Sequence, residues 1–575
     1  MWRVSDGSEV ELLSDPVPAT GRGISGGVHV WHPDGDAVFV VTRSAGIVRV
    51  DLVDDRPVRM VRLPFGADRS WSTPAVSKDG RSLAAIADWR EVFTWNLDDA
   101  MDPDAVELVH TGHDFMIDCD WWGERLMAVA WDRPHMPWTR SRIVGADLPH
   151  GESVQQPRAS ADGTVRGWID DSTGVNVLNV HTDEGRWTTL DECENAGPTW
   201  GPGQRSWCIS PDGTRFAVTR NVDGFGELQV LWFGTGKFEW QRISLTVHGC
   251  LSWEGDTLVA VRTGARTPTQ VVAYDVSAES FESGEHPRAV LFETGDPQWR
   301  SVFDEELVEP TITETTTDAG RIVSRWYRAA RPHGGLIVWV HGGPYDQWQV
   351  TWRPRFSYWL SRGWSICVPD HRGSSGHGRG FMQAHEGKWG DVDAVDVLEV
   401  AKGLWQARPM EWTVPSCTVF MGSSAGGLTA LNAARLANEE GIRVGGVVVS
   451  CPVVDLDAMF DGDDPFETHD MRRLVGPRTD HTVVRRSPHL NGGELLGVPV
   501  LVFHGDIDTS VPIEHSEKLV DGVRASGGNK IRLVVMEGEG HGFRNPEIVR
   551  REYAETETFL EAVHRSRVAT EDPFP

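Results

Sequence analysis

Residues 418–428 read TVFMGSSAGGL, and this stretch decides the fold of the second half of the chain. Its first four residues form a largely apolar run, which is typical of a strand buried on both faces. A helical pattern over residues 425–438 follows at once. Between them lies G-x-S-x-G, the pattern of a sharp strand-to-helix turn that lifts its central serine above a sheet. The stretch therefore predicts Ser424 as a nucleophile and Ser423 as a bystander.

Further apolar runs alternate with helical patterns on both sides of this stretch. Strands are expected at residues 335–340, 365–368, 418–421, 444–449, 498–503 and 531–536. Helices are expected at residues 391–408, 425–438, 513–525 and 547–567. This alternation favours a doubly wound, mostly parallel sheet, which we assign to a domain over residues 306–575. In such a sheet the active site gathers at the carboxyl ends of the strands.

A serine nucleophile needs a base, and the base needs an acid that orients it. His541 and Asp508 each follow an expected strand, in the chain order Ser, Asp, His that this fold uses. We therefore predict His541 as the base and Asp508 as the orienting acid. Asp506 is a rival acid, whose alternative role is to bind the backbone amides of its own loop. His504, at the end of the same strand, is expected to be structural.

Acyl transfer to a serine also needs two N–H donors for the developing oxyanion. One is expected from Ala425, directly after the nucleophile. The other should come from the loop after an early strand, and residues 341–344 (HGGP) follow the strand expected at 335–340. We assign the Gly343 N–H to this role, with Gly342 as the close alternative. If neither donates, the two glycines serve only to make a turn.

The first half of the chain reads as a repeat of short strands and tight turns. The turns contain Gly35, Gly80, Gly123, Gly163, Gly213 and Gly255, at intervals of 45, 43, 40, 50 and 42 residues. Glycine suits such turns because it adopts positive φ without a Cβ clash. A period in the low forties matches one four-stranded propeller blade. Residues 1–305 are therefore predicted to form a β-propeller of six or seven blades, and the alternative is a large β-sandwich.

Composition excludes several classes of function. The 575-residue chain carries a formal net charge of −29, which would repel nucleic acids and anionic membranes, so neither is expected as a partner. No apolar run reaches the ~18 residues of a membrane helix, and the N-terminus lacks the apolar segment of a signal peptide. The seven cysteines are scattered and form no C-x-x-C, which argues against a disulfide framework. We expect a cytoplasmic protein.

Metal and cofactor motifs are also missing. His385-Glu386 is not followed by a second histidine at the spacing of an H-E-x-x-H zinc motif. Residues 373–380 are rich in glycine, but no Gly-Lys-Ser/Thr follows, as a phosphate-binding loop would require. We therefore expect neither a metal nor an organic cofactor.

Several segments of the second half resemble signatures of the prolyl oligopeptidase family of serine peptidases. They are residues 341–344 (HGGP), 372–378 (RGSSGHG), 388–391 (KWGD), 422–427 (GSSAGG), 504–512 (HGDIDTSVP) and 538–543 (GEGHGF). The resemblance covers both halves of the chain, because it implies a propeller before an α/β-hydrolase domain. Its H-G-x-x-D-x-x-V-P pattern favours Asp508 over Asp506.

The similarity is greatest to the acylaminoacyl-peptidase and aminopeptidase branch, through residues 465–468 (PFET) and 474–477 (LVGP). His341 stands where proline-specific branches tend to carry Tyr, and Ala425 stands where dipeptidyl peptidases tend to carry Tyr. Both departures argue against strict cleavage after proline. The resemblance further implies that the propeller caps the active site and admits small substrates, and it is compatible with a homo-oligomer.

Together these observations predict a serine peptidase that acts on short peptides or on aminoacyl and acylaminoacyl amides, through an acyl-enzyme. One alternative is an esterase or amidase for a small metabolite, because fold and triad do not fix the acyl group. Another is a catalytically silent interaction protein that uses the propeller as a scaffold.

Overall fold

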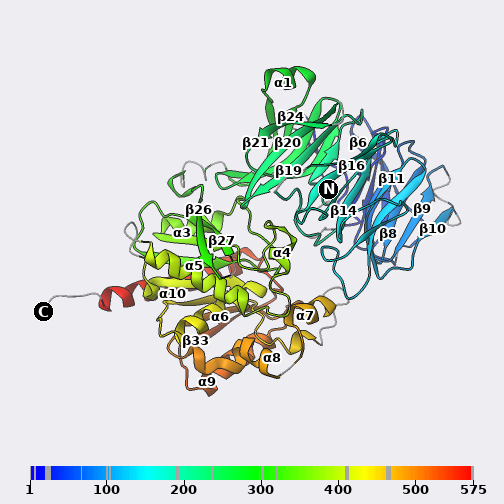
Figure 1. Ribbon diagram of the computed structural model, residues 1–575. Helices are drawn as coiled ribbons and strands as arrows, with labels where there is room; N and C mark the ends of the chain where they lie inside the picture. The colour runs from blue at the N-terminus through cyan, green and yellow to red at the C-terminus, as the bar shows by residue number, and fades with distance from the viewer. Residues whose placement is uncertain are drawn as a thin grey trace. The chain divides into compact units, whose positions relative to one another are not determined.

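The structure is a computed structural model, which describes residues 2–570 except for residues 6–7, 20–26, 67, 99–101, 103–104, 190–192, 235–236, 297, 299–303, 319, 408–412, 461–467 and 479. The chain divides into two compact units, which Figure 1 draws together. The first contains residues 1–295 and 349–352, and the second contains residues 296–348 and 353–575. The boundary that we predicted between residues 305 and 306 stays a prediction, since residues 299–303 lie outside the described part.

The first unit is a β-propeller, and its described residues form six blades. Each blade is an antiparallel sheet of four strands, or of three in the third blade, with the strands in chain order. The blades are β3 (His29–Trp31), β4 (Ala37–Val41), β5 (Ile47–Val53), β6 (Arg56–Arg62); β7 (Trp71–Val76), β8 (Ser82–Ala87), β9 (Glu91–Asn96), β10 (Val106–His110); β11 (Phe115–Trp122), β12 (Arg125–Trp131), β13 (Arg142–Val144); β14 (Val154–Ala159), β15 (Arg166–Asp170), β16 (Val177–Thr182), β17 (Gly185–Thr188); β18 (Trp207–Ile209), β19 (Arg215–Val222), β20 (Phe225–Gly234), β21 (Lys237–Ser244); and β22 (Val247–Glu254), β23 (Thr257–Gly264), β24 (Thr267–Asp275), β25 (Arg288–Glu293). The propeller is confirmed, and the predicted choice of six or seven blades is settled at six.

The repeated glycine turns join the first and second strands of all six blades. Their glycines have φ between 53° and 74°, the left-handed region in which a Cβ is unfavourable. In the fourth blade Asp162 fixes the turn, because its Oδ1 accepts from Ser160 Oγ at 2.6 Å and from the Thr164 N–H at 3.1 Å. The glycine turns predicted from the sequence therefore occupy the same position in every described blade, between its first and second strands.

Tryptophan side chains tie the first strands of neighbouring blades together. Trp121 Nε1 donates to the Ala75 carbonyl at 3.0 Å, and Trp207 Nε1 donates to the Gln156 carbonyl at 3.1 Å. Each bond joins one first strand to the first strand of the preceding blade. The first strands thus form the inner ring of the propeller, around its central channel.

Outside the six blades, the described part of the first unit has a two-stranded sheet of β1 (Trp2–Ser5) and β2 (Ser8–Glu11), and one short helix, α1 (Ala278–Ser283).

The second unit is an α/β-hydrolase fold with one eight-stranded sheet. The strand order is β26-β27-β29-β28-β30-β31-β32-β33. β27 is antiparallel to both of its neighbours, β26 and β29, and the other neighbouring pairs of this sheet are parallel. The strands are β26 (Thr311–Thr317), β27 (Gly320–Tyr327), β28 (Gly335–Val340), β29 (Trp364–Pro369), β30 (Thr418–Ser423), β31 (Gly446–Ser450), β32 (Val500–Gly505) and β33 (Ile531–Met536).

Helices cover both faces of this sheet. Val338 and Val340 of β28 belong to the apolar core that α5 and α6 share, whereas Trp339, which points to the opposite face, packs on Phe356 of α3. Trp359 of α3 in turn stacks on Tyr553 of α10. The helices are α3 (Pro354–Ser361), α4 (Gly378–Gln383), α5 (Val392–Gln406), α6 (Ala425–Glu439), α7 (Thr468–Val475), α8 (Asp480–Arg486), α9 (Glu514–Ala525) and α10 (Pro546–Thr570), with short 3₁₀ turns at Asp304–Glu306, Pro415–Cys417, Ala458–Phe460 and Pro488–Leu495.

All seven cysteines are free thiols. Within the described residues, none of the helices combines the length and the apolar character that a membrane crossing requires.

Candidate active site

Ser424 lies at a strained turn between β30 and α6. Its φ and ψ are 55° and −125°, a conformation that non-glycine residues rarely adopt. Glycines make the turn possible: a Cβ on Gly422 would stand 2.2 Å from the Gly426 carbonyl oxygen, and one on Gly426 would stand 2.4 Å from that of His341. The sequence therefore folds into the sharp elbow that G-x-S-x-G predicts.

Asp508 and His541 lie side by side in the loops after β32 and β33. His541 Nδ1 and Asp508 Oδ2 are 2.7 Å apart, so the ring donates to the carboxylate. Asp508 Oδ1 accepts the N–H groups of Ser510 and Val511 at 2.9 and 3.0 Å. One oxygen of Asp508 is thus held by the loop that carries it, and the other is held by His541 from the loop after β33.

Hydrogen bonds keep this aspartate ionised. Burial opposes its charge, but the bonds from His541 and from the Val511 amide outweigh burial and lower the pKa of Asp508. An ionised Asp508 holds the proton of the neutral imidazole on Nδ1 and leaves Nε2 as the basic atom.

The two neighbouring residues that we weighed in the sequence have other partners. Asp506 Oδ1 accepts the Gly538 N–H at 2.6 Å, which joins the loops after β32 and β33. His504 is fully buried, with Nδ1 at 2.6 Å from Ser516 Oγ and Nε2 at 2.8 Å from the Val511 carbonyl oxygen. Burial lowers the pKa of His504, so this ring is neutral and structural.

The turn after β28 lies against the elbow. A Cβ built on Gly342 would stand 3.1 Å from the Ser423 carbonyl oxygen and 3.7 Å from Ser424 Cβ. Gly343 has a φ of 114°, which only glycine adopts without strain. The predicted donors Gly343 and Ala425 therefore belong to the two segments that meet at Ser424.

His341, at the start of this turn, fixes it through buried contacts. It is buried and stacks on His371 with ring centroids 4.5 Å apart, and its Nε2 lies 2.7 Å from Ser374 Oγ. Burial lowers the pKa of His341 to about 3, so the ring is neutral and serves to fix the turn.

The ion-pair network around Arg473 of α7 holds the same turn from another side. Arg473 donates to Tyr345 Oη at 2.8 Å, to Glu386 Oε1 at 2.5 Å and to Asp470. The residues 474–477 (LVGP) that we compared with the aminopeptidase branch follow directly, and a Cβ on Gly476 would stand 2.9 Å from Gly387 Cα. Residues 465–467 of the other branch motif lie outside the described part of the chain.

Cys451 is the site residue that sequence reasoning missed. It follows β31, has a φ of 47°, and its Sγ lies within 4.8 Å of ligand atoms of His504 and Asp508. Its Sγ is also 3.9 Å from the carbonyl oxygen of Gly540, next to His541. No spacing rule singles out this cysteine, because only the parallel pairing of β31 with β32 brings it to the aspartate.

The same three side chains form the one described group with the spacing of metal ligands. Burial raises the pKa of the Cys451 thiol to about 12, so it stays protonated. Both ring nitrogens of His504 have partners within the protein. The group is therefore a hydrogen-bonded support of the aspartate, and its chemistry does not suit a metal ion.

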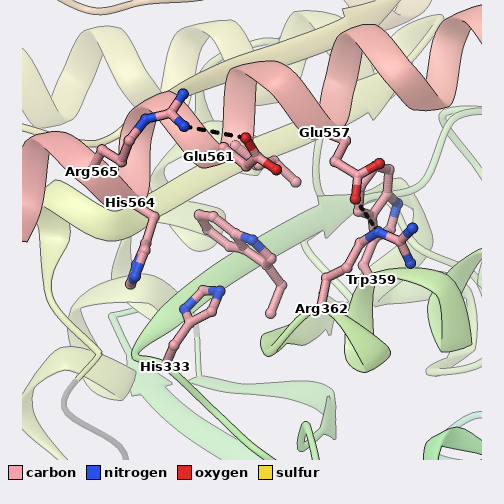
Figure 2. Close-up of a pocket in the computed structure, with 9 residues that line it drawn as sticks. His333, Trp359, Arg362, Glu557, Glu561, His564 and Arg565 are labelled. Atoms are coloured by element: carbon pink, nitrogen blue, oxygen red, sulfur yellow. Dashed lines mark hydrogen bonds and ion pairs between the residues drawn. The ribbon is translucent and has the colours of Figure 1, made fainter.

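A separate cavity of about 230 Å³ lies at the opposite end of the sheet (Figure 2). Its lining includes Trp364, at the start of β29, together with residues of α3 and α10. Its charges are paired internally, since Arg362 bonds to Glu557 and Arg565 bonds to Glu561 at 3.3 Å. Because Ser424 and His541 lie at the carboxyl ends of the strands, this cavity is not part of the candidate active site.

Part of the second unit is similar to a known protein family. Residues 348–566 match the model of the prolyl oligopeptidase family. The predicted resemblance to the prolyl oligopeptidase family is confirmed. Dipeptidyl aminopeptidase BIII of Pseudoxanthomonas mexicana is 28% identical over 233 residues, which are 39% of this chain and 32% of that relative. The acylamino-acid-releasing enzyme of Arabidopsis thaliana is 23% identical over 37% of this chain and 28% of its own length. The match thus spans about a third or less of these curated relatives.

Solved structures support the fold of both units. A puromycin-hydrolyzing peptidase of Mycobacterium tuberculosis has a TM-score of 0.82, covering 98% of this chain and 90% of that one, at 22% identity. Puromycin hydrolase has a TM-score of 0.79, covering 97% and 89%, at 24% identity. At these identities the similarity concerns architecture, a propeller followed by an α/β-hydrolase domain.

Proposed function

We propose that this chain is a serine peptidase that hydrolyses short peptides, or aminoacyl and acylaminoacyl amides. The observation that carries the proposal is the 2.7 Å bond between His541 Nδ1 and Asp508 Oδ2, in a sheet whose elbow presents Ser424. The match of the second unit to the prolyl oligopeptidase family supports the same chemistry.

The reaction runs through an acyl-enzyme. Ser424 Oγ attacks the substrate carbonyl carbon while His541 Nε2 takes the hydroxyl proton. The tetrahedral intermediate collapses when His541 gives this proton to the leaving amine, and the C–N bond breaks. A water molecule, deprotonated by the same His541, then releases the acyl group as a carboxylate and restores Ser424. Asp508 remains ionised throughout and stabilises the imidazolium.

Backbone amides stabilise the negative charge of each tetrahedral intermediate. The Ala425 N–H and the Gly343 N–H donate to its oxyanion, with Gly342 as the alternative to Gly343. The proton transfer by His541 and the oxyanion donors should each contribute at least ~10²-fold to the rate.

The substrates are expected to be small. Following the family resemblance, we assign the propeller the role of a cap that excludes large substrates. Intact folded proteins should then be cleaved far more slowly than peptides of a few residues. Rapid cleavage of a folded protein, measured by gel electrophoresis against a short peptide control, would argue against this role.

A matched pair of substrates tests the proposal. We would measure kcat/KM for an aminoacyl p-nitroanilide and for its N-acetylated form, with the wild type, Ser424→Ala and the neighbouring control Ser423→Ala. Hydrolysis of either amide by the wild type and by Ser423→Ala, and its loss in Ser424→Ala, is the expected result. Preference for the free amine would indicate an aminopeptidase, and preference for the acetylated form an acylaminoacyl-type peptidase. Failure on both amides with rapid cleavage of simple esters would replace the peptidase by a metabolite esterase.

A further inference from the structure

The segment formed by residues 197–206, here called the axial segment, crosses the centre of the propeller. Its Gly197 carbonyl oxygen accepts from Gln155 Nε2 of the fourth blade at 3.0 Å. Its Gly203 N–H donates to Asp118 Oδ1 of the third blade at 2.7 Å. The Leu251 N–H of the sixth blade donates to the Arg205 carbonyl at 2.9 Å. Since a segment can reach three blades in this way only near the axis, it passes through the central channel.

The inner strands carry strained bulges next to this segment. The first strands of the second, third, fourth and sixth blades each shift register once. Within each shift lies a non-glycine residue with φ between 45° and 54°: Thr73, Asp118, Gln156 and Cys250. A bulge re-aims the side chains around it, so these strained positions turn side chains of the inner strands toward the axial segment.

Two arginines face the channel without an acidic partner. Arg158 of β14 donates through Nη2 to the Gln204 carbonyl at 3.0 Å, but its buried Nε has no acceptor. Arg205 belongs to the axial segment itself. Among the described residues, no carboxylate comes within ion-pair distance of either guanidinium. Proteins rarely enclose arginines unless they are paired, because a buried charge without a counter-ion is costly.

Asp118 adds an unsatisfied acceptor to the same place. Its side chain is 6% exposed, and its Oδ2 has no hydrogen-bond partner, whereas its Oδ1 is held by Gly203. Burial raises the pKa of Asp118, while the Gly203 amide and the charges of Arg158 and Arg205 act in the opposite direction.

The arginines also repel each other. Burial lowers the pKa of Arg205, and the charge of Arg158 lowers it further, with Asp120 acting in the opposite direction. The channel therefore brings two guanidinium groups close together inside a chain whose net charge is −29.

From this geometry we propose that Arg158 and Arg205 form a binding site for a small oxyanion, a carboxylate or a phosphate, inside the propeller. The planar guanidinium fork suits such groups, because it donates two parallel hydrogen bonds to two oxygens. The site is independent of Ser424, since all of its residues belong to the first unit.

The test compares the thermal unfolding of full-length variants in inorganic phosphate with that in NaCl of equal ionic strength. The variants are Arg158→Gln, Arg205→Gln and the control Arg140→Gln, which removes the same charge from a side chain that is 66% exposed. Phosphate should raise the Tm of the wild type and of Arg140→Gln by about 3 °C or more, and should leave the two site variants unchanged. Sodium acetate in a parallel series shows whether a carboxylate alone suffices. Equal shifts in all four proteins, or no shift with either anion, would overturn the proposal.

The sign of the effect without anion gives a second test. In a buffer free of oxyanions, Arg205→Gln removes an unpaired charge, so its Tm should equal or exceed that of the wild type. A purely structural arginine would give a lower Tm, and that result would contradict the site.

A measurement on the wild type covers the case in which a variant does not fold. Phosphate should slow the modification of Arg158 and Arg205 by phenylglyoxal, read by peptide mass spectrometry, and should leave that of Arg140 unchanged. Unchanged rates at all three arginines would overturn the proposal.

Discussion

Arg325 of the hydrolase unit and the pair Arg158 and Arg205 of the propeller have opposite surroundings. In the hydrolase unit Arg325 is fully buried, and both of its terminal nitrogens donate to Asp370. Asp370 Oδ2 also lies 2.7 Å from Gln347 Nε2 and from His377 Nε2. In the propeller Arg158 and Arg205 have no such carboxylate within the described residues. Arg325 has its charge neutralised within its own fold, whereas Arg158 and Arg205 are the arginines that we propose to bind an oxyanion.

The loops of the two units differ in the same sense. The six glycine turns of the propeller repeat one geometry, and each serves its own blade. The carboxyl ends of β30, β32 and β33 are all different, and each presents one residue of the proposed triad, Ser424, Asp508 or His541. Repetition therefore builds the scaffold, and the singular strand ends provide the chemistry.

The largest expected effect tests whether catalysis depends on the singular elbow of the hydrolase unit. Ser424→Ala should lower kcat on a cleaved p-nitroanilide by roughly 10⁶, by analogy with triad deletions in other serine peptidases. The propeller is unchanged in this variant, so its thermal unfolding should match the wild type. Retention of more than about a tenth of the activity, far above that residual, would reject Ser424 as the nucleophile.

The next effect separates the two acids at the end of β32. Asp508→Asn should reduce kcat by about 10⁴, because an amide no longer holds the imidazole in the working tautomer. Asp506→Asn is the matched control, since Asp506 binds the Gly538 amide and not His541. Steady-state kinetics on both variants decide between them, and a larger loss in Asp506→Asn would exchange their roles.

A stability measurement compares the buried ion pair of Arg325 with an exposed ion pair in the same unit. Asp370→Asn leaves the charge of Arg325 uncompensated, which should lower the free energy of unfolding by about 3–5 kcal/mol. Glu314→Gln breaks an exposed pair with Arg321 on the same sheet and should change it by less than about 1 kcal/mol. Urea unfolding measures both, and equal effects would mean that burial does not set the value of these ion pairs.

The smallest effect concerns pH. Burial raises the pKa of Asp346, in the turn after β28, from 3.8 to about 6. The folded state therefore binds this proton more tightly than the unfolded state, and stability falls as pH rises from about 4 to 6. Asn cannot ionise, so Asp346→Asn should remove the loss of stability that ionisation of Asp346 causes. It should raise the free energy of unfolding at pH 8 by roughly 1–2 kcal/mol, with no gain near pH 4. A variant that is less stable than the wild type at pH 8 would contradict this reading.

Much of the fold could be predicted from local pattern. The apolar runs at 335–340 and 531–536 coincide with β28 and β33, and the helical patterns at 425–438 and 513–525 coincide with α6 and α9 to within a residue. In contrast, β26 was not predicted, because it is rich in threonine and no residue in it is buried. A strand that buries no face leaves no continuous apolar signal in the sequence.

The functional residues also fall into two groups, those that a local motif predicts and those that only contacts between distant parts of the chain bring together. Ser424, Asp508 and His541 could be predicted because each closes a recognisable motif at a strand end. Cys451 and the pair of Arg158 and Arg205 could not, since their neighbours are brought to them by strand pairing and by a segment that crosses the propeller. No sequence spacing encodes those approaches.

The most direct test of the central claim is to map the adduct formed with a fluorophosphonate, which reacts only with an activated serine. We expect one adduct per chain, on Ser424 and not on Ser423, and we expect His541→Ala to abolish it. An adduct on Ser423, or undiminished labelling of Ser424 in His541→Ala, would contradict the assignment of Ser424 as a nucleophile activated by His541.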